Sequence, residues 1–289
     1  FLRTRAPGMS INRVPILTWG TLTASVANLL AVPSVSLAFF LLWMDRQFGT
    51  QFFSASLGQP LIWQHLFWMF GPPWVYAIVL PAMGMVSDAL PTFCRRPLVG
   101  YTPVALSTVA TMALGFGVWV HHMFATGLPS LALSFFSGAS LIITIPSAVA
   151  VFAWTATIWT GRPVIKTAFL FFASMIVLFV IGGVSGFMTA SVPVDWQLTD
   201  TYFVVAHIHY VLIGINVFPV CGALYYWFPK MTGRMMDERL GRWNFWTMFI
   251  GFNLAFLPMH WTGLRGMPRR VYTYADGMGW DTLNLITTI

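Results

Sequence analysis

Of the 289 side chains, 57% are hydrophobic and only 8% are charged, which excludes an ordinary soluble globular protein and a disordered chain. The formal net charge of +7 would suit a nucleic-acid-binding protein, but the basic residues lie in short segments between long apolar runs. The two cysteines, Cys94 and Cys221, are far apart and form no Cys-x-x-Cys pair. The composition therefore predicts a helical membrane protein, with lipid and not nucleic acid as its surroundings.

Seven apolar runs are long enough to cross a bilayer, which takes roughly 20 helical residues. They lie near 14–44, 62–87, 99–122, 131–160, 167–191, 199–229 and 240–262. An eighth begins near Asp281 and is cut off at Ile289. The predicted fold class is all-α, a polytopic transmembrane helical bundle of seven complete spans plus a truncated eighth. We expect residues 1–289 to form a single membrane domain.

The basic residues are distributed unevenly between the two sides of this bundle. One side carries Arg3, Arg5, Arg13, Arg95, Arg96, Arg162, Lys166, Lys230, Arg234, Arg239 and Arg242. By the positive-inside rule this side is cytoplasmic or faces the mitochondrial matrix, with the N-terminal end of the chain inside. On the other side Arg265, Arg269 and Arg270 form a cluster against the rule. Three such cations favour anionic partners that guanidinium groups can hold, with a solvated basic loop as the alternative.

Two histidines lie two residues apart inside the sixth run, in the sequence DTYFVVAHIHY of residues 200–210. Hydrocarbon offers imidazole no water to bond, so the pair is costly unless something binds both rings. Residues two apart on a helix point about 200° apart, so His207 and His209 serve two different partners. A planar cofactor on each flank, taking one axial nitrogen from each ring, fits this geometry. Hydrogen bonding to neighbouring helices is the alternative.

Three runs bring ligand-type or redox-type residues to the outer half of the membrane. At 1.5 Å per residue, His207 and His209 lie about 12–15 Å from the outer end of their run. Residues 72–76 lie about 15–21 Å deep in theirs. The pair His121 and His122 ends the third run, where adjacent rings about 100° apart could share one metal. A polar pair at a helix end is the alternative for these two; together, the three runs predict a buried metal-cofactor site.

The motifs resemble those of the haem-copper oxidase catalytic subunit, the cytochrome c oxidase subunit I family. Residues 200–210 are similar to that family's tenth helix, and residues 119–124 (WVHHMF) to its copper-binding segment. Residues 64–68 (QHLFW) and 264–270 (LRGMPRR) also match. The resemblance covers nearly the whole chain, as helices five to eleven and the start of twelve. The early helices of the family are absent from it.

The resemblance implies a role for each candidate site residue. His207 would ligate a high-spin haem and His209 a low-spin haem, while His121 and His122 would hold copper. Tyr76 would donate a proton and an electron.

On the outer side, Arg269 and Arg270 would bind haem propionates, with Asp195 beside them. Asp200 would lie at a magnesium site, although Thr199 stands where the family has a histidine. His260 is interpreted as a structural residue near the haem edge.

The implied reaction is that of a terminal respiratory oxidase. Such a subunit reduces dioxygen to water with electrons from cytochrome c or a quinol, coupled to proton uptake and translocation. It works in the respiratory chain within a complex of oxidase subunits, one of which receives the electrons. The resemblance places the chain in a bacterial cytoplasmic membrane or the mitochondrial inner membrane.

The chain departs from the family at three positions that carry chemistry. Residues 71–76 read GPPWVY, so Pro72 stands where the family has the third copper-ligand histidine. Trp74 replaces a proton-carrying glutamate and Ala150 replaces the lysine of a second proton path. These departures support a second hypothesis, a haem-binding electron-transfer or assembly paralogue that has lost the copper site and oxygen reduction. Nitric oxide reduction and plain transport are weaker alternatives.

Overall fold

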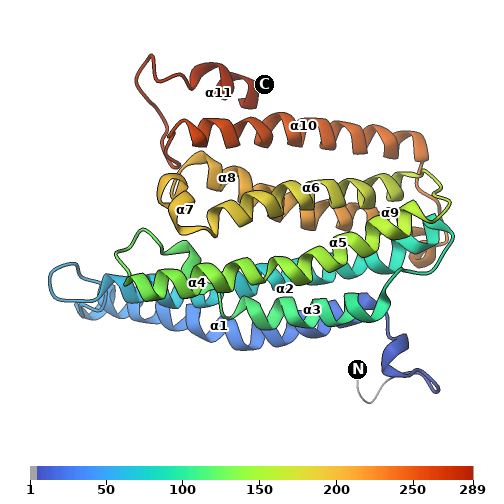
Figure 1. Cartoon of the computed structure of the whole chain (residues 1–289), viewed down its shortest axis with the longest axis horizontal. Coiled ribbons are helices and arrows are strands. Elements are labelled where there is room, and N and C mark those ends of the chain that lie inside the picture. The colour runs from blue at the N-terminus through green and yellow to red at the C-terminus, as the bar shows by residue number, and fades with distance from the viewer. Residues whose placement is uncertain (1–4, 289) are drawn as a thin grey trace.

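The computed structural model describes residues 5–288 as a bundle of long helices that lie side by side (Figure 1). The elements follow one another as η1 (Ile11–Arg13), α1 (Ile16–Phe48), α2 (Pro60–Cys94), α3 (Tyr101–Gly115), η2 (Trp119–His122), α4 (Ser130–Ile142), α5 (Thr144–Trp159), α6 (Thr167–Thr189), α7 (Val192–Leu198), α8 (Tyr202–His209), η3 (Tyr210–Val217), α9 (Phe218–Thr232), α10 (Glu238–Leu264) and α11 (Asp281–Thr288).

Within residues 5–288, five helical segments are long and apolar enough to cross a membrane: α1, α2, α4 with α5, α6, and the stretch from α8 through η3 to α9. The prediction of an all-helical polytopic membrane bundle is therefore confirmed. Helices α3 and α10 occupy the two remaining predicted runs. With 15 residues α3 is shorter than a typical span, and α10 begins with a charged turn that contains Glu238.

The predicted run at 99–122 was wrong at its outer end. Helix α3 stops at Gly115, and His121 and His122 lie on the separate 3₁₀ helix η2. Gly115 and Gly117 flank the break, and glycine is a poor helix former because it loses the most backbone freedom on folding. The histidine pair therefore lies on a short 3₁₀ helix that does not continue α3.

Two other predicted runs contain breaks that prolines explain. The run at 131–160 is interrupted at Ile143, between α4 and α5. Pro146 has no N–H to donate to the carbonyl of Ile142, so the regular ladder ends there. The run at 199–229 contains the π-helix η3, directly before Pro219. A π-helix inside an α-helix frequently marks a functional site.

Close backbone approach holds α1 against α2. A Cβ atom on Gly20 would lie 2.4 Å from the carbonyl oxygen of Leu80, and one on Gly84 would lie 2.5 Å from the Cα atom of Leu17. At the end of the same interface, the two carboxylate oxygens of Asp88 each accept a 2.9 Å hydrogen bond, from the amides of Ile16 and Leu17. Asp88 on α2 thus caps the first turn of α1.

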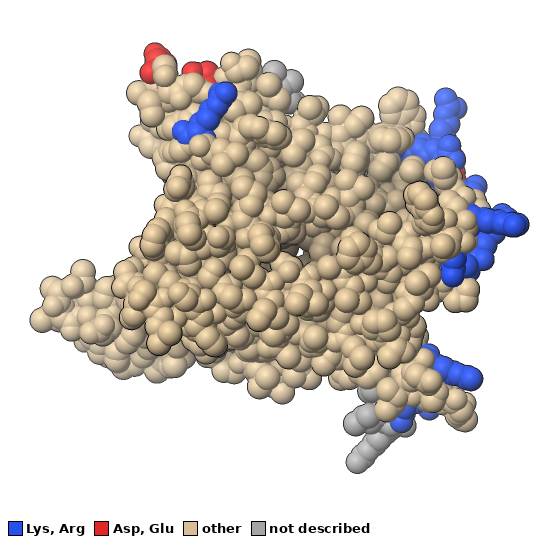
Figure 2. All heavy atoms as spheres, in the orientation of Figure 1, with Lys and Arg blue, Asp and Glu red and all other residues tan. Residues whose placement is uncertain are grey.

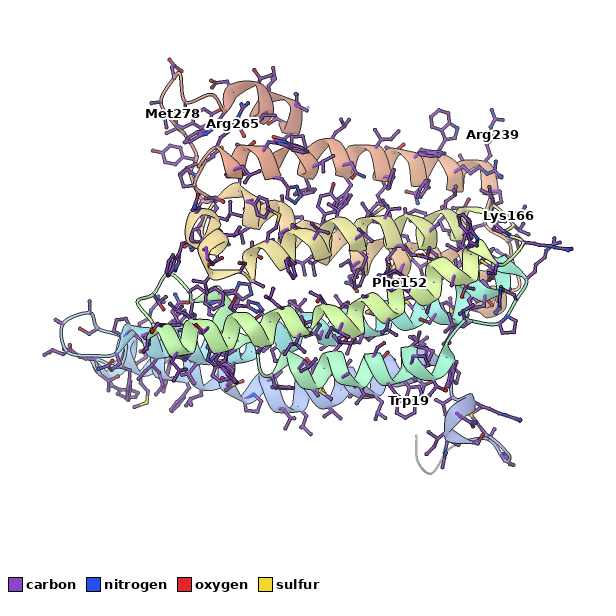
Figure 3. The ribbon with its side chains drawn as sticks, in the orientation of Figure 1. Trp19, Phe152, Lys166, Arg239, Arg265 and Met278 are labelled. Atoms are coloured by element: carbon purple, nitrogen blue, oxygen red, sulfur yellow. The ribbon has the colours of Figure 1, made fainter. Side chains whose placement is uncertain are left out.

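Lysine and arginine gather at one end of the bundle, where α1 begins and α2 ends (Figure 2). Lys166 and Arg239 lie at this end, and Arg265 lies at the other (Figure 3). We call the first end the basic end. The two ends of the bundle therefore differ in charge as the sequence predicts for two sides of a membrane.

The glycine contacts give a stability prediction. Gly20→Ala should lower the thermal unfolding midpoint of the detergent-solubilised protein, by about 1–3 kcal/mol in unfolding free energy, because the new methyl group meets a backbone carbonyl. Gly138→Ala is the matched control, since nothing lies within 4 Å of that Cβ. The control should be neutral or stabilising. Equal midpoints for the two variants would contradict the close packing.

Candidate functional site

His207 projects from α8 towards α6 and is held there by its Nδ1 atom. This nitrogen lies 3.0 Å from the carbonyl oxygen of Gly182 and 3.2 Å from Oγ of Ser185. A carbonyl only accepts, so Nδ1 carries the proton and Nε2 keeps a free lone pair. A Cβ on Gly186 would lie 2.8 Å from Cε1 of His207, so only glycine fits there. A fixed Nδ1–H and a free Nε2 are typical of a metal-ligating histidine.

His209 is oriented in the same manner on a different flank of α8. Its Nδ1 atom lies 2.7 Å from the carbonyl oxygen of Val205 and therefore carries the proton. Its ring stacks on Phe256 of α10, with ring centroids 4.2 Å apart. One ring thus meets α6 and the other meets α10, as the i, i+2 spacing predicts. Both Nε2 atoms fit the axial position of a haem.

His121 and His122 lie with ring centroids 4.3 Å apart on η2. Oγ of Ser140 donates to the carbonyl of Phe136 at 2.6 Å, so its lone pair accepts from Nδ1 of His121, 3.1 Å away. The His122 ring stacks on Trp68 of α2 at 4.0 Å.

Both rings of this pair are within electrostatic range of His207. The structure thus places three histidines from two distant segments in the same region of the bundle, although among residues 5–288 they do not form a set of three metal ligands.

No side chain that can ligate a metal stands at position 72, where the family has a third histidine. Pro72 is buried on α2 and has no side-chain donor atom. Among residues 5–288, no group of three or more His, Cys, Asp or Glu side chains is arranged to hold a metal ion. The two imidazoles of η2 therefore do not make the three-imidazole copper site of the family.

Tyr76 lies one turn further along α2 and packs its ring on α3, where a Cβ on Gly115 would lie 2.5 Å from Cδ2 of Tyr76.

The arginine loop, residues 264–270, is tied to the start of α8, on the side of His207 and His209 that lies away from the basic end. The Arg269 amide donates to the carbonyl of Asp200 at 2.8 Å, and Nε of Arg269 lies 3.9 Å from Oδ1 of Asp200. Thr201 and Pro268 form an antiparallel bridge. Asp200 and Arg270 have φ of 56° and 68°, a left-handed conformation that is uncommon outside glycine. These contacts fix Arg269 beside the N-terminal end of α8.

Asp195 lies on the short helix α7 and is only 5% exposed. Burial raises the pKa of its carboxyl to about 6, the nearby Asp200 adds to the rise, and a hydrogen bond from Thr199 opposes it. Oγ1 of Thr199 donates to Oδ2 of Asp195 at 2.6 Å. Asp195 is thus a buried carboxyl on the side of the bundle where the arginine loop lies.

Several side chains of the site were not predicted from the sequence. Ser140 and Ser185 orient two of the histidines, and Trp68 covers a third. Their only sequence signal is a hydroxyl or an indole inside an apolar run. His260 lies with its ring 5.1 Å from that of Phe203 and its Nδ1 atom 3.1 Å from the carbonyl oxygen of Leu257, while its buried Nε2 atom has no hydrogen-bond partner among residues 5–288. Its structural role stays a prediction.

Comparison with known proteins decides the family. The family model described as cytochrome c and quinol oxidase polypeptide I matches residues 1–289. The chain belongs to this family. The resemblance to haem-copper oxidase subunit I that the motifs indicated is thereby confirmed.

Two relatives of this oxidase-family chain illustrate the match. A probable cytochrome c oxidase subunit 1-beta of Nocardia farcinica is 48% identical over 285 residues, which are 99% of this chain and 48% of the relative. Cytochrome c oxidase subunit 1 of Bacillus subtilis is 47% identical over 289 residues, which are 100% of this chain and 46% of the relative. The chain spans about half the length of the curated relatives it matches.

A solved structure has the same fold. The cryo-EM structure of a haem-copper terminal oxidase dimer matches with a TM-score of 0.80, over 95% of this chain and 54% of that chain, at 21% identity.

The buried carboxyl of this oxidase-family chain gives a pH prediction. The folded pKa of about 6 lies above the ordinary value of 3.8, so the folded state favours the protonated carboxyl of Asp195, and the fold is more stable at low pH, where this carboxyl is protonated. This advantage is lost as the pH rises from 3.8 through 6, with a slope of up to about 1.4 kcal/mol per unit. Asp195→Asn should remove this dependence in thermal unfolding scans between pH 4 and 7. Parallel curves for variant and parent would contradict the raised pKa.

Proposed function

We propose that this chain carries the oxygen-reducing centre of a terminal respiratory oxidase, which reduces dioxygen to water with electrons from cytochrome c or a quinol and takes up protons. The observation that carries the proposal is the pair His207 and His209, directed to two flanks of α8 with each Nδ1 anchored and each Nε2 free. A family match over the full chain supports it.

The two histidines take different roles in the proposal. His207 would hold the high-spin haem on the α6 side, and Gly182 and Ser185 keep its ring in place. His209 would hold the low-spin haem on the α10 side, where its ring stacks on Phe256. A haem supplies the iron at which dioxygen binds and through which electrons pass. Both histidines belong to one helix, so their positions relative to each other are fixed by the backbone of α8.

The other site residues take part in proton transfer or bind charged groups. Tyr76 donates a proton and an electron, and Arg269 and Arg270 hold haem propionates as bidentate donors. Asp195 lies beside these propionates, and Asp200 contributes to a magnesium site.

The partners follow from the same proposal: an electron-entry subunit, further oxidase subunits, and the lipid of a bacterial cytoplasmic or mitochondrial inner membrane. In this setting the chain makes seven complete spans, with the basic end inside.

A second function has one specific observation in its favour. Pro72 leaves two imidazoles, His121 and His122, where the family has three copper ligands. The chain would then be a haem-binding electron-transfer or assembly paralogue without oxygen reduction.

Substitution of each α8 histidine should remove a different haem. In the purified complex, His207→Ala should abolish the carbon monoxide difference spectrum and leave the low-spin absorbance. His209→Ala should do the reverse, because each ring faces its own flank. His65→Gln is the control, since His65 accepts from Trp119 at 3.3 Å and lies on α2. Loss of both haems in both variants, with the control intact, would contradict separate roles.

The copper-to-haem ratio separates the two functions, provided that any copper centre of an accessory subunit is counted apart. Copper beside a haem that binds carbon monoxide would support the oxidase, whereas haem without such copper and without oxygen turnover would support the paralogue. In the second case Pro72→His should raise the copper content, because it restores a third imidazole. Trp74→His is the matched control: this residue is 40% exposed, so an added imidazole there should bind no extra copper.

A further inference from the structure

We propose that buried hydroxyl groups on one face of α3 carry protons from the basic end of the bundle to Tyr76. The route takes the place of an ionisable side chain at position 150, where the chain has a fully buried alanine. The inference rests on the proposed function, in which Tyr76 gives up a proton that must be replaced.

The route follows a single buried face of α3. Ser107, Thr108 and Thr111 are 5%, 1% and 2% exposed. Residues spaced by three, four and seven lie on the same side of a helix, and Gly115 continues that side by one more turn. Successive turns rise about 5–6 Å, a gap that one water molecule spans with two hydrogen bonds. The face therefore carries a ladder of three hydroxyls that rises about 6 Å along α3 towards Gly115.

Thr111 differs from the two hydroxyls below it. Ser107 and Thr108 both donate to the carbonyl of Val104, at 2.8 and 2.9 Å, and keep their lone pairs free. Thr111 is buried on the same face, yet its Oγ1 has no hydrogen-bond partner among residues 5–288. A hydroxyl inside a helix ordinarily donates to the carbonyl four residues earlier. Buried polar groups without a protein partner are satisfied by bound water, which places a water site one turn below Tyr76.

Both ends of the ladder meet suitable groups. At the top, the Tyr76 ring lies directly against α3 at Gly115, about 6 Å along the axis from Thr111. At the basic end, Val104 shares a buried cluster with Ile16, whose amide donates to Asp88. The half-buried Asp88 carboxylate thus stands level with the foot of the ladder. Trp19 marks this end of α1 and α3 in Figure 3.

The buried hydroxyl of Ser87, on the side of α2 that faces Trp154 of α5, is already paired. It accepts from Nε1 of Trp154 at 2.9 Å and donates to the carbonyl of Met83 at 2.8 Å. Ser87 is therefore engaged as donor and acceptor at once, whereas Thr111 is engaged as neither. In each hop along α3, a hydroxyl or water gives a proton to the next oxygen and takes one from the previous oxygen. Charge and covalent structure are unchanged, and the proton ends on the phenolate oxygen of Tyr76.

The test is proton uptake by the purified complex when its haems are reduced without oxygen, followed with a pH-indicating dye in H₂O and D₂O. Thr111→Val removes the hydroxyl and keeps the shape of the side chain. Uptake and the coupled reduction of the high-spin haem should slow by about tenfold or more, while reduction of the low-spin haem stays unchanged. Thr111→Ser should restore the parental rate. Thr102→Val, at an exposed position on the same helix, is the matched control.

The outcomes separate this route from the proposed function. A Thr111→Val complex with the parental uptake rate and isotope effect overturns the route, as does a parental complex that takes up no proton on reduction. A parental complex that takes up protons through Thr111 but consumes no oxygen supports the route and overturns the oxidase. Haem content and the carbon monoxide spectrum show that each variant is folded.

Discussion

Hydrocarbon cannot hydrogen-bond, and this constraint determines how nearly every polar side chain in the bundle is placed. Asp88 finds two amides at the start of α1, Trp154 donates to Ser87, and the hydroxyls of α3 donate to a backbone carbonyl. Two imidazole nitrogen atoms differ from these paired groups. The Nε2 atoms of His207 and His209 belong to rings that are anchored through Nδ1, and they have no protein partner in the hydrogen bonds of the described chain. This arrangement is typical of metal-ligating histidines.

The breaks in the helices occur close to the same site. The 3₁₀ helix η2 carries His121 and His122, and the π-helix η3 begins directly after His209. Irregular backbone at membrane depth is tolerated where it is buried in protein or lines a cavity. The 3₁₀ segment η2 and the π segment η3 of the bundle thus lie next to the histidines of the candidate site.

The sequence predicted the helical runs, the two flanks of α8 and the family, because each depends on apolar length or on fixed helical angles. It did not predict that α3 ends at Gly115 or that residues 210–217 form a π-helix, because these depend on local backbone hydrogen bonds that hydropathy does not record. Ser140 and Ser185 were missed for another reason. Their partners are distant in sequence, and periodicity within one helix says nothing of what the next helix brings.

Pro72 shows that fold and chemistry are separable in this family. A proline inside a helix removes one amide, so with Pro73 the carbonyls of Trp68 and Met69 lose their usual partners. Yet α2 runs unbroken from Pro60 to Cys94, and Trp68 still stacks on His122. The packing of α2 on α1 depends on glycines further along the helix, not on residue 72. The bundle therefore accommodates a proline where the family has an imidazole, and the reaction must be argued from the site and not from the fold.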